Sequence, residues 1–285
     1  MNIGQAVILG IVQGLTEFLP VSSSGHLVLV QRIFQKVWGG EGIAEPGLFF
    51  DTLLHCGTLV AVFFVFRRDI WNILRRPFQR FTWLLILATA VTAVVAFGFM
   101  DTLEEAFASG RWLGQAFLVT GAALFLSEYL SRLPGDSRND AEMGWFDAVF
   151  IGALQGIAAI LPGVSRSGFT LSGALSRRLE RNLAARFSFL LSIPAILGGL
   201  AVQIKEMMEI SGFQSINPEA SSGLTGGVDI IPAIAGTVTA ALVGFASIVL
   251  LLKMIRERSL VGFGVYTAVL GLLVLLDQNV THWVF

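Results

Sequence analysis

Two short polar segments interrupt apolar stretches of this chain, and they carry the residue types that could do chemistry. The first segment holds Glu17, three consecutive serines and His26, and the second holds Arg166 between two serines. An ionisable side chain is costly to bury in apolar surroundings unless it is paired. These residues are therefore the first candidates for a functional site.

Arg166 stands in a Gly- and Ser-rich turn at the start of a helix predicted over 167–176. Backbone N–H groups at a helix N-terminus bind anions, and the planar guanidinium matches phosphate oxygens. Further donors would be the hydroxyl groups of Ser165, Ser167 and Thr170. The turn predicts a phosphate-binding site. The alternative is a capped helix start whose arginine pairs with a lipid head group.

His26 closes the first segment, after Ser22, Ser23 and Ser24. The reference pKa of histidine, near ~6.5, suits either a nucleophile or an acid that protonates a leaving oxygen. The alternative is a structural histidine that is only hydrogen-bonded.

Gln13 and Glu17 are four residues apart, so both project from one face of a helix. Their oxygens could hold a hard cation such as Mg²⁺ or Ca²⁺. Glu17 could instead orient His26 or a water molecule, or serve helix packing. Asp51 and His55 have the same spacing in a later apolar stretch, where they could line the same cavity or hydrogen-bond to each other.

The composition is that of a membrane protein. Hydrophobic residues make up 54% of the 285 residues and charged residues 14%, whereas soluble domains carry roughly 25% charged residues. This excludes a soluble enzyme, and the net charge of −1 without a basic block argues against a nucleic-acid partner. We expect an all-α polytopic protein with a single membrane domain over 1–285 and about six transmembrane helices, at 48–66, 82–100, 112–131, 184–204, 230–252 and 259–277.

The loops between these spans differ in charge. Most of the 19 Lys and Arg fall in alternate loops, around 67–80, 132–138, 177–186 and 253–258. The intervening loops are acidic, with Asp101, Glu104, Glu105, Glu206, Glu209, Glu219 and Asp229. Because cytoplasmic loops carry the excess of Lys and Arg, we expect the arginine-rich loops inside the cell and the acidic loops outside.

Two apolar stretches are too short to span a membrane and resemble each other. The motif GIVQGLTEFLPVSSSGH at 10–26 matches GALQGIAAILPGVSRSGFT at 152–170. The matching pairs are Gly10 with Gly152, Gln13 with Gln155, Gly14 with Gly156, Pro20 with Pro162 and Gly25 with Gly168. Non-helical backbone at membrane depth is tolerated only where protein buries it or where it lines a wet cavity. Both stretches are therefore predicted to be re-entrant helix–loop–helix hairpins.

Three spans separate the two hairpins, and an odd number inverts the second copy relative to the first. The sequence thus predicts an inverted repeat of about 1–131 and 145–285, in which the two hairpin tips face each other inside the protein. Inverted repeats with broken helices are typical of transporters.

The chain resembles the undecaprenyl-diphosphate phosphatase family, bacterial membrane enzymes also known for bacitracin resistance. The resemblance is carried by QGLTEFLPVSSSGH at 13–26 and PGVSRSGFT at 162–170, and it extends to FDTLLHCGTLVAVFFVFRRDI at 50–70 and FSFLLSIPAILGG at 187–199. It covers nearly the whole chain.

The resemblance implies removal of the terminal phosphate from undecaprenyl diphosphate, which recycles the carrier lipid for cell-wall synthesis, with a divalent cation as cofactor. By motif position, Gln13 and Glu17 would be the metal-associated pair. Ser22, Ser23 and His26 would belong to the catalytic turn, where Ser22 and Ser24 would also bind substrate. The second turn, with Ser165, Arg166, Ser167 and Thr170, would hold the diphosphate. Many members have Glu where this chain has Gln13, so a cation here would lose one charged ligand.

The residues leave the nucleophile open between His26, Ser23 and a water molecule. The family implies the bacterial inner membrane, with a site that we expect to open to the external side, and Gly-rich helix faces permit a homodimer. The rival functions are a transporter or flippase of a phosphorylated lipid or anion, which the repeat favours, and a lipid-binding protein without catalysis.

Overall fold

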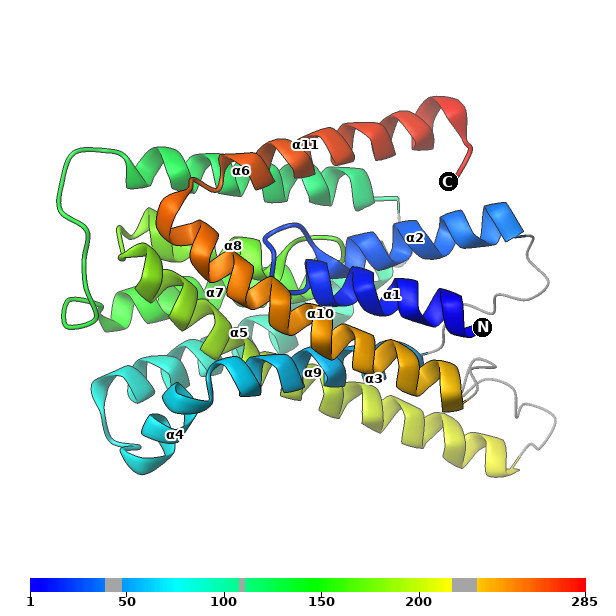
Figure 1. Ribbon diagram of the computed structural model, residues 1–285, viewed down its shortest axis with the longest axis horizontal. Helices are drawn as coiled ribbons and strands as arrows, with labels where there is room; N and C mark the ends of the chain where they lie inside the picture. The colour runs from blue at the N-terminus through cyan, green and yellow to red at the C-terminus, as the bar shows by residue number, and fades with distance from the viewer. Residues whose placement is uncertain (39–47, 108–110, 217–229) are drawn as a thin grey trace.

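The computed structural model describes residues 1–38, 48–107, 111–216 and 230–285. The described residues form helices and no strand. The helices are α1 (Ile3–Thr16), α2 (Ser23–Trp38), α3 (Leu48–Val65), α4 (Arg67–Arg75), α5 (Arg80–Phe107), α6 (Leu113–Ser131), α7 (Trp145–Ile160), α8 (Arg166–Ser176), α9 (Arg181–Ile216), α10 (Ile230–Glu257) and α11 (Val261–Leu276), followed by the short π-helix η2 (Asp277–Thr281). The expected all-α class is confirmed (Figure 1).

Within the described residues, five helices are long and apolar enough to cross a membrane: α5, α6, α9, α10 and α11. The sixth expected span, 48–66, is only partly straight. The chain bends by 73° between α3 and α4, and together the two form either one broken span or a re-entrant loop. The described residues thus give five to six spans, which agrees with the expected number of about six, and the protein is a multi-pass membrane protein.

Glycines bring the helices into close contact. Helix α1 packs along α10, and α7 packs along α5. A Cβ atom on Gly14 would lie 2.8 Å from the carbonyl oxygen of Ala240, and one on Gly156 would lie 2.6 Å from Cβ of Val95. Only glycine permits these approaches. The glycines that the two sequence motifs share are therefore explained by packing within one chain, and a homodimer stays a prediction.

The breaks in the two short helical stretches fall where the polar segments stand. Helix α1 ends at Thr16 and α2 begins at Ser23, while α7 ends at Ile160 and α8 begins at Arg166. Helix α1 packs on α10, and α7 packs on α5. In both cases the first helix of a predicted hairpin packs on a long helix of the other predicted copy, which supports the repeat. Its inverted topology, its boundaries and the re-entrant character of the hairpins stay predictions.

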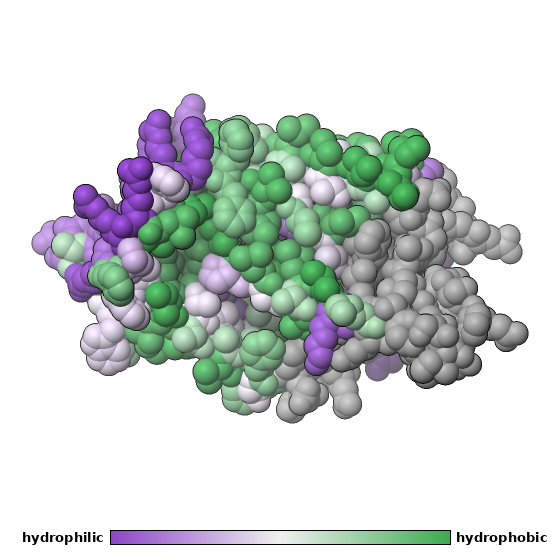
Figure 2. Space-filling model, turned by 90° about the horizontal axis from the view of Figure 1, so that it is seen from below, coloured by the Kyte–Doolittle hydropathy of each residue, from purple (hydrophilic) through white to green (hydrophobic). Residues whose placement is uncertain are grey.

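The basic loops gather at one end of the molecule, where α4 and the connection between α6 and α7 lie in Figure 1. Figure 2 shows this end as strongly hydrophilic and the flank beside it as mostly apolar. The structure does not describe the side chains at 101–107, 206 and 209, nor residues 217–229. The acidic residues predicted to be external therefore either have side chains that are not described or lie outside the described residues, and the orientation of the chain in the membrane stays a prediction.

Candidate active site

The two polar turns touch each other directly. The Ser24 Oγ atom accepts a hydrogen bond from the Gly163 backbone N–H at 3.3 Å, and the Ser167 hydroxyl donates to the Leu19 carbonyl at 2.9 Å. An ion pair joins the buried Glu17 to the partly buried Arg166, which is 149 residues further along the chain. These contacts make one structural unit from two distant segments.

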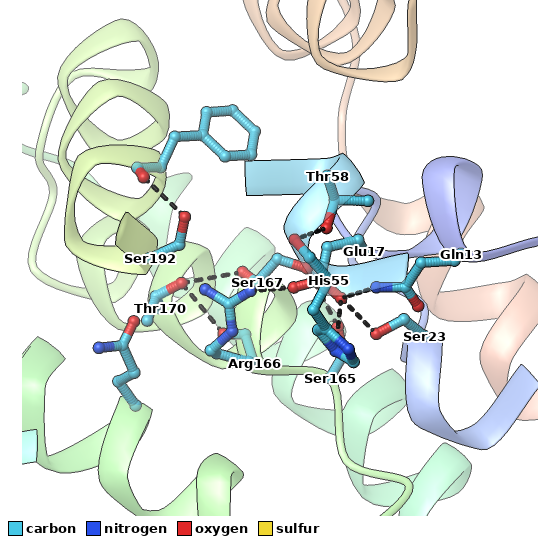
Figure 3. Close-up of polar contacts among 12 residues, drawn as sticks. Gln13, Glu17, Ser23, His55, Thr58, Ser165, Arg166, Ser167, Thr170 and Ser192 are labelled. Atoms are coloured by element: carbon cyan, nitrogen blue, oxygen red, sulfur yellow. Dashed lines mark hydrogen bonds and ion pairs between the residues drawn. The ribbon is translucent and has the colours of Figure 1, made fainter. Parts of the chain in front are cut away.

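Glu17 is the centre of this unit (Figure 3). One carboxylate oxygen pairs with the Arg166 guanidinium. The other accepts hydrogen bonds from the Ser23 hydroxyl at 2.7 Å and from the Gln13 amide at 3.1 Å. The Nε2 atom of His55 lies 3.9 Å from the same oxygen. The Glu17 side chain is 4% exposed, so its charge is stabilised by these donors and not by bulk water.

A cavity of about 230 Å³ lies where the turns meet. Its polar wall includes Glu17, Ser23, Ser24, His55, Ser165, Arg166 and Ser167. Its apolar wall is made by α7 and α9, with Ala158, Ala159, Ile196, Gly199 and Leu200. A site that is polar on one side and apolar on the other suits an amphiphile with a charged head.

The serines of the first turn have different tasks. The Ser23 hydroxyl faces Glu17 and lines the cavity. Ser22 instead precedes α2, where its Oγ accepts the Gly25 N–H at 3.2 Å, and its φ of 75° is a left-handed conformation rare for a non-glycine residue. Ser165 caps α8 in the same way, accepting the Gly168 N–H at 3.0 Å. Ser22 and Ser165 thus hold the helix starts in place.

His26 points away from the cavity. Its Nδ1 lies 2.6 Å from the Ser22 carbonyl oxygen, and its Nε2 lies 2.7 Å from the Tyr266 hydroxyl. The imidazole also stacks on the Tyr266 ring and meets the edge of Phe117. A carbonyl can only accept, so Nδ1 carries the proton and Nε2 accepts from the tyrosine. In this arrangement both ring nitrogens are occupied, and neither faces Glu17 or Ser23.

His55 is the histidine at the cavity. Its Nδ1 donates to the Asp51 backbone carbonyl at 2.8 Å, which fixes the ring and turns Nε2 toward Glu17. The two sequence alternatives for Asp51 and His55 are thus partly resolved: His55 lines the cavity, and its partner is the Asp51 backbone. The i, i+4 spacing of Asp51 and His55 indicates that they share one helix face. The packing of α3 beside α1, which brings His55 to Glu17, cannot be read from the sequence.

Thr170 lies behind the cavity wall. Its hydroxyl donates back to carbonyl oxygens of its own helix and lies 2.5 Å from the Ser188 hydroxyl on α9. It therefore connects α8 to α9 and positions the Arg166 turn. Ser167 lines the cavity, but its hydroxyl already donates a hydrogen bond to the Leu19 carbonyl. Arg166 is the cationic side chain of this turn that lines the cavity.

The oxygen atoms beside Glu17 suit a hard cation. Gln13 is fully buried, and its Oε1 atom has no hydrogen-bond partner. The amide presents Nε2 and not Oε1 to the Glu17 carboxylate, and Gln13 does not line the cavity, whereas Glu17 and Ser23 do. Within the described part of the chain, no three His, Cys, Asp or Glu side chains come together as metal ligands. Glu17 is therefore the one carboxylate at this place, and a hard cation such as Mg²⁺ would need most of its ligands from substrate and water.

Known proteins match the chain along its length. The model of the family described as bacitracin resistance protein BacA matches residues 6–273. An undecaprenyl-diphosphatase of Carboxydothermus hydrogenoformans is 44% identical over 98% of both chains. Undecaprenyl-diphosphatase 4 of Bacillus cereus is 38% identical over 98% of both, and an undecaprenyl-diphosphatase of Methanosphaera stadtmanae is 37% identical over 97% of this chain and 98% of its own. The chain therefore belongs to the bacitracin resistance protein BacA family.

Proposed function

We propose that this protein removes the terminal phosphate from undecaprenyl diphosphate, which yields undecaprenyl phosphate and inorganic phosphate. The observation that carries the proposal is the contact between Ser23, Glu17 and Arg166 in one cavity. This contact combines the Ser23 hydroxyl, the Glu17 carboxylate that can accept the hydroxyl proton, and the Arg166 guanidinium that can bind the phosphate. The names of the relatives, undecaprenyl-diphosphatases over nearly their full length, support the same reaction.

In the proposed reaction, Ser23 is the nucleophile. Its Oγ attacks the terminal phosphorus while Glu17, at 2.7 Å, accepts the hydroxyl proton. The bond between that phosphorus and the bridging oxygen breaks, and undecaprenyl phosphate leaves with the electron pair. Water then attacks the phosphoserine, Glu17 returns its proton to the Ser23 oxygen, and inorganic phosphate leaves. His26 supports the turn that carries Ser23.

Charge neutralisation is the main requirement of phosphoryl transfer. Arg166 is the group of this chain that we assign to the transferred phosphate, because its guanidinium reaches both the cavity and Glu17. His55 presents Nε2 to the same space and is the side chain best placed to hydrogen-bond a water or phosphoryl oxygen beside Glu17.

A divalent cation, Mg²⁺ or Ca²⁺, is part of the proposal. Gln13 and Glu17 would hold it once the Gln13 amide turns its unpartnered Oε1, in place of Nε2, toward Glu17. When bound, it would neutralise charge on the diphosphate oxygens. One carboxylate with a neutral amide predicts weaker cation binding than two carboxylates would give.

The apolar wall of the cavity indicates how the lipid lies. Ala159 and Gly199 are exposed residues on α7 and α9, and both line the cavity. We propose that the prenyl chain leaves the cavity between these helices. We also propose that the protein resides in the bacterial inner membrane with the cavity open to the external side. A membrane-impermeant thiol reagent should then label a Ser23→Cys variant, in a Cys56→Ser background, from outside and not from inside.

The proposed function is tested with purified protein in detergent and undecaprenyl diphosphate, by measuring phosphate release and the lipid product together. We expect both products in equal amounts, loss of activity with a chelator, and loss in Arg166→Gln but not in Arg76→Gln, an exposed arginine outside the cavity. Substrate binding without product formation would contradict the enzyme and favour a transporter or lipid-binding protein.

A further inference from the structure

A second cavity, of about 500 Å³, opens at the arginine-rich end of the molecule. It lies between the end of α6 and the loop that follows, the turn between α8 and α9, and the end of α10. Four arginines from these segments line it: Arg132, Arg178, Arg181 and Arg256. It shares no lining residue with the cavity at Glu17, and it belongs to the hydrophilic end seen in Figure 2.

Two of these arginines share one buried carboxylate. Arg132 and Arg181 both pair with the carboxylate of Glu128, at 3.3 and 2.7 Å. Glu128 is 2% exposed and also accepts the backbone N–H of Leu260 at 3.2 Å. This buried carboxylate joins α6, α9 and the start of α11, so it fixes the base of the cavity.

The other two arginines have no such partner. Among the residues that the structure describes, neither Arg178 nor Arg256 forms an ion pair, although Nε of Arg256 donates to the Asn182 side chain at 2.8 Å. Asp136 and Glu180 also line the cavity, but both are exposed and pair with neither arginine. Two guanidinium groups thus remain for an anion from outside the chain.

Arg178 is held in place by an unusual backbone. Its φ of 59° is left-handed, which is uncommon for a residue with a side chain. Its carbonyl accepts the Arg138 N–H at 2.7 Å, and Arg138 in turn accepts the Glu180 N–H at 2.9 Å. Its guanidinium lies so close to Gly135 that any Cβ there would collide with it. The left-handed residue closes the C-terminus of α8, where the Leu179 N–H donates to the Ala174 carbonyl at 3.1 Å, and the Arg178 side chain lines the cavity.

We propose that this cavity is a second anion site, which binds a phosphate group through Arg178 and Arg256. The planar guanidinium forms paired hydrogen bonds with phosphate oxygens, and the cavity is large enough for such a group with water. The phosphate comes either from inorganic phosphate or from the head group of an anionic phospholipid, since this end of the protein meets both water and the membrane surface. The proposal is independent of the proposed function.

The test uses the full chain in phosphatidylcholine nanodiscs. An Arg166→Gln background removes phosphate binding at the other cavity. In one arm, inorganic phosphate is titrated by calorimetry. In the other, phosphatidylglycerol is added to the nanodiscs and native mass spectrometry measures the lipid that stays bound. The double variant Arg178→Gln, Arg256→Gln is compared with Arg68→Gln, Arg76→Gln, which removes equal charge from exposed positions that do not line the cavity.

We expect the Arg178 and Arg256 pair, and not the control pair, to lower affinity at least about tenfold in one arm, the usual effect of losing a charge-assisted hydrogen bond. A loss of affinity for inorganic phosphate identifies free phosphate as the ligand. A loss of affinity only for phosphatidylglycerol identifies a lipid head group as the ligand. Arg178→Gly separates binding from folding, because it relieves the left-handed backbone and should raise the melting temperature while binding is lost. Equal behaviour of both pairs in both arms would overturn the proposal.

Discussion

The ion pair between Glu17 and Arg166 joins the two turns, and its removal should reveal how strongly they depend on each other. We consider Glu17→Gln, Arg166→Gln and the double variant. Either single change leaves one charge without its partner, at a place where the carboxylate is 4% and the guanidinium side chain 18% exposed. The double change removes both charges.

The expected size follows from burial. Breaking a buried pair from one side costs about 3–5 kcal/mol, because the remaining charge is left desolvated. In Arg166→Gln the charge left behind is the Glu17 carboxylate, which still accepts hydrogen bonds from Ser23 and Gln13, so we expect the lower end, about 3 kcal/mol. Glu17→Gln also disturbs hydrogen bonds from Ser23 and Gln13 and should cost at least as much. The double variant should cost clearly less than the sum, with a coupling energy of about 2–3 kcal/mol.

The assay is denaturant unfolding of the purified protein in a mild detergent, with the free energy of unfolding of all four proteins measured under one condition. The four values form a double-mutant cycle that isolates the interaction between the two residues. If the two single losses simply add within about 0.5 kcal/mol, the turns are not coupled through this pair and the reasoning is wrong.

Three further predictions concern single positions. Ser22→Ala should lower the free energy of unfolding by about 1 kcal/mol, the usual value of a helix cap, and leave turnover per folded molecule largely intact. His55→Phe should lower kcat with little change in unfolding, whereas His26→Phe should mainly destabilise the turn, and a larger loss of kcat in a well-folded His26→Phe would contradict this assignment. Gly14→Leu should prevent α1 from packing on α10, which would show as loss of folded protein by gel filtration, while the same change at Gly198, where a Cβ meets open space, should be tolerated.

Much of this arrangement could be predicted from the sequence. Long uncharged stretches determine membrane helices because every backbone group must be paired inside the bilayer. The repeated motif indicated that two broken helices meet, and it singled out Glu17 and Arg166, which the structure brings into contact. The shared glycines Gly14 and Gly156 serve helix packing within the chain.

The sequence did not indicate which histidine faces the cavity. His26 stands beside the serines in the chain, yet its partner Tyr266 lies 240 residues away, on α11. His55 reaches Glu17 only through the register of α3 against α1, which depends on side-chain packing between helices distant in sequence. Local spacing determines which residues share a helix face, but it does not determine what that face meets.

The most direct test of the central claim is turnover of undecaprenyl diphosphate by Ser23→Ala, with Ser22→Ala as the matched control. Both variants remove one hydroxyl from neighbouring positions, but only the Ser23 hydroxyl faces Glu17 and the cavity. We predict that Ser23→Ala lowers kcat about a thousandfold or more while the folded protein still binds substrate. A kcat of Ser23→Ala within a few fold of the unchanged protein would contradict the account and leave the reaction to another nucleophile.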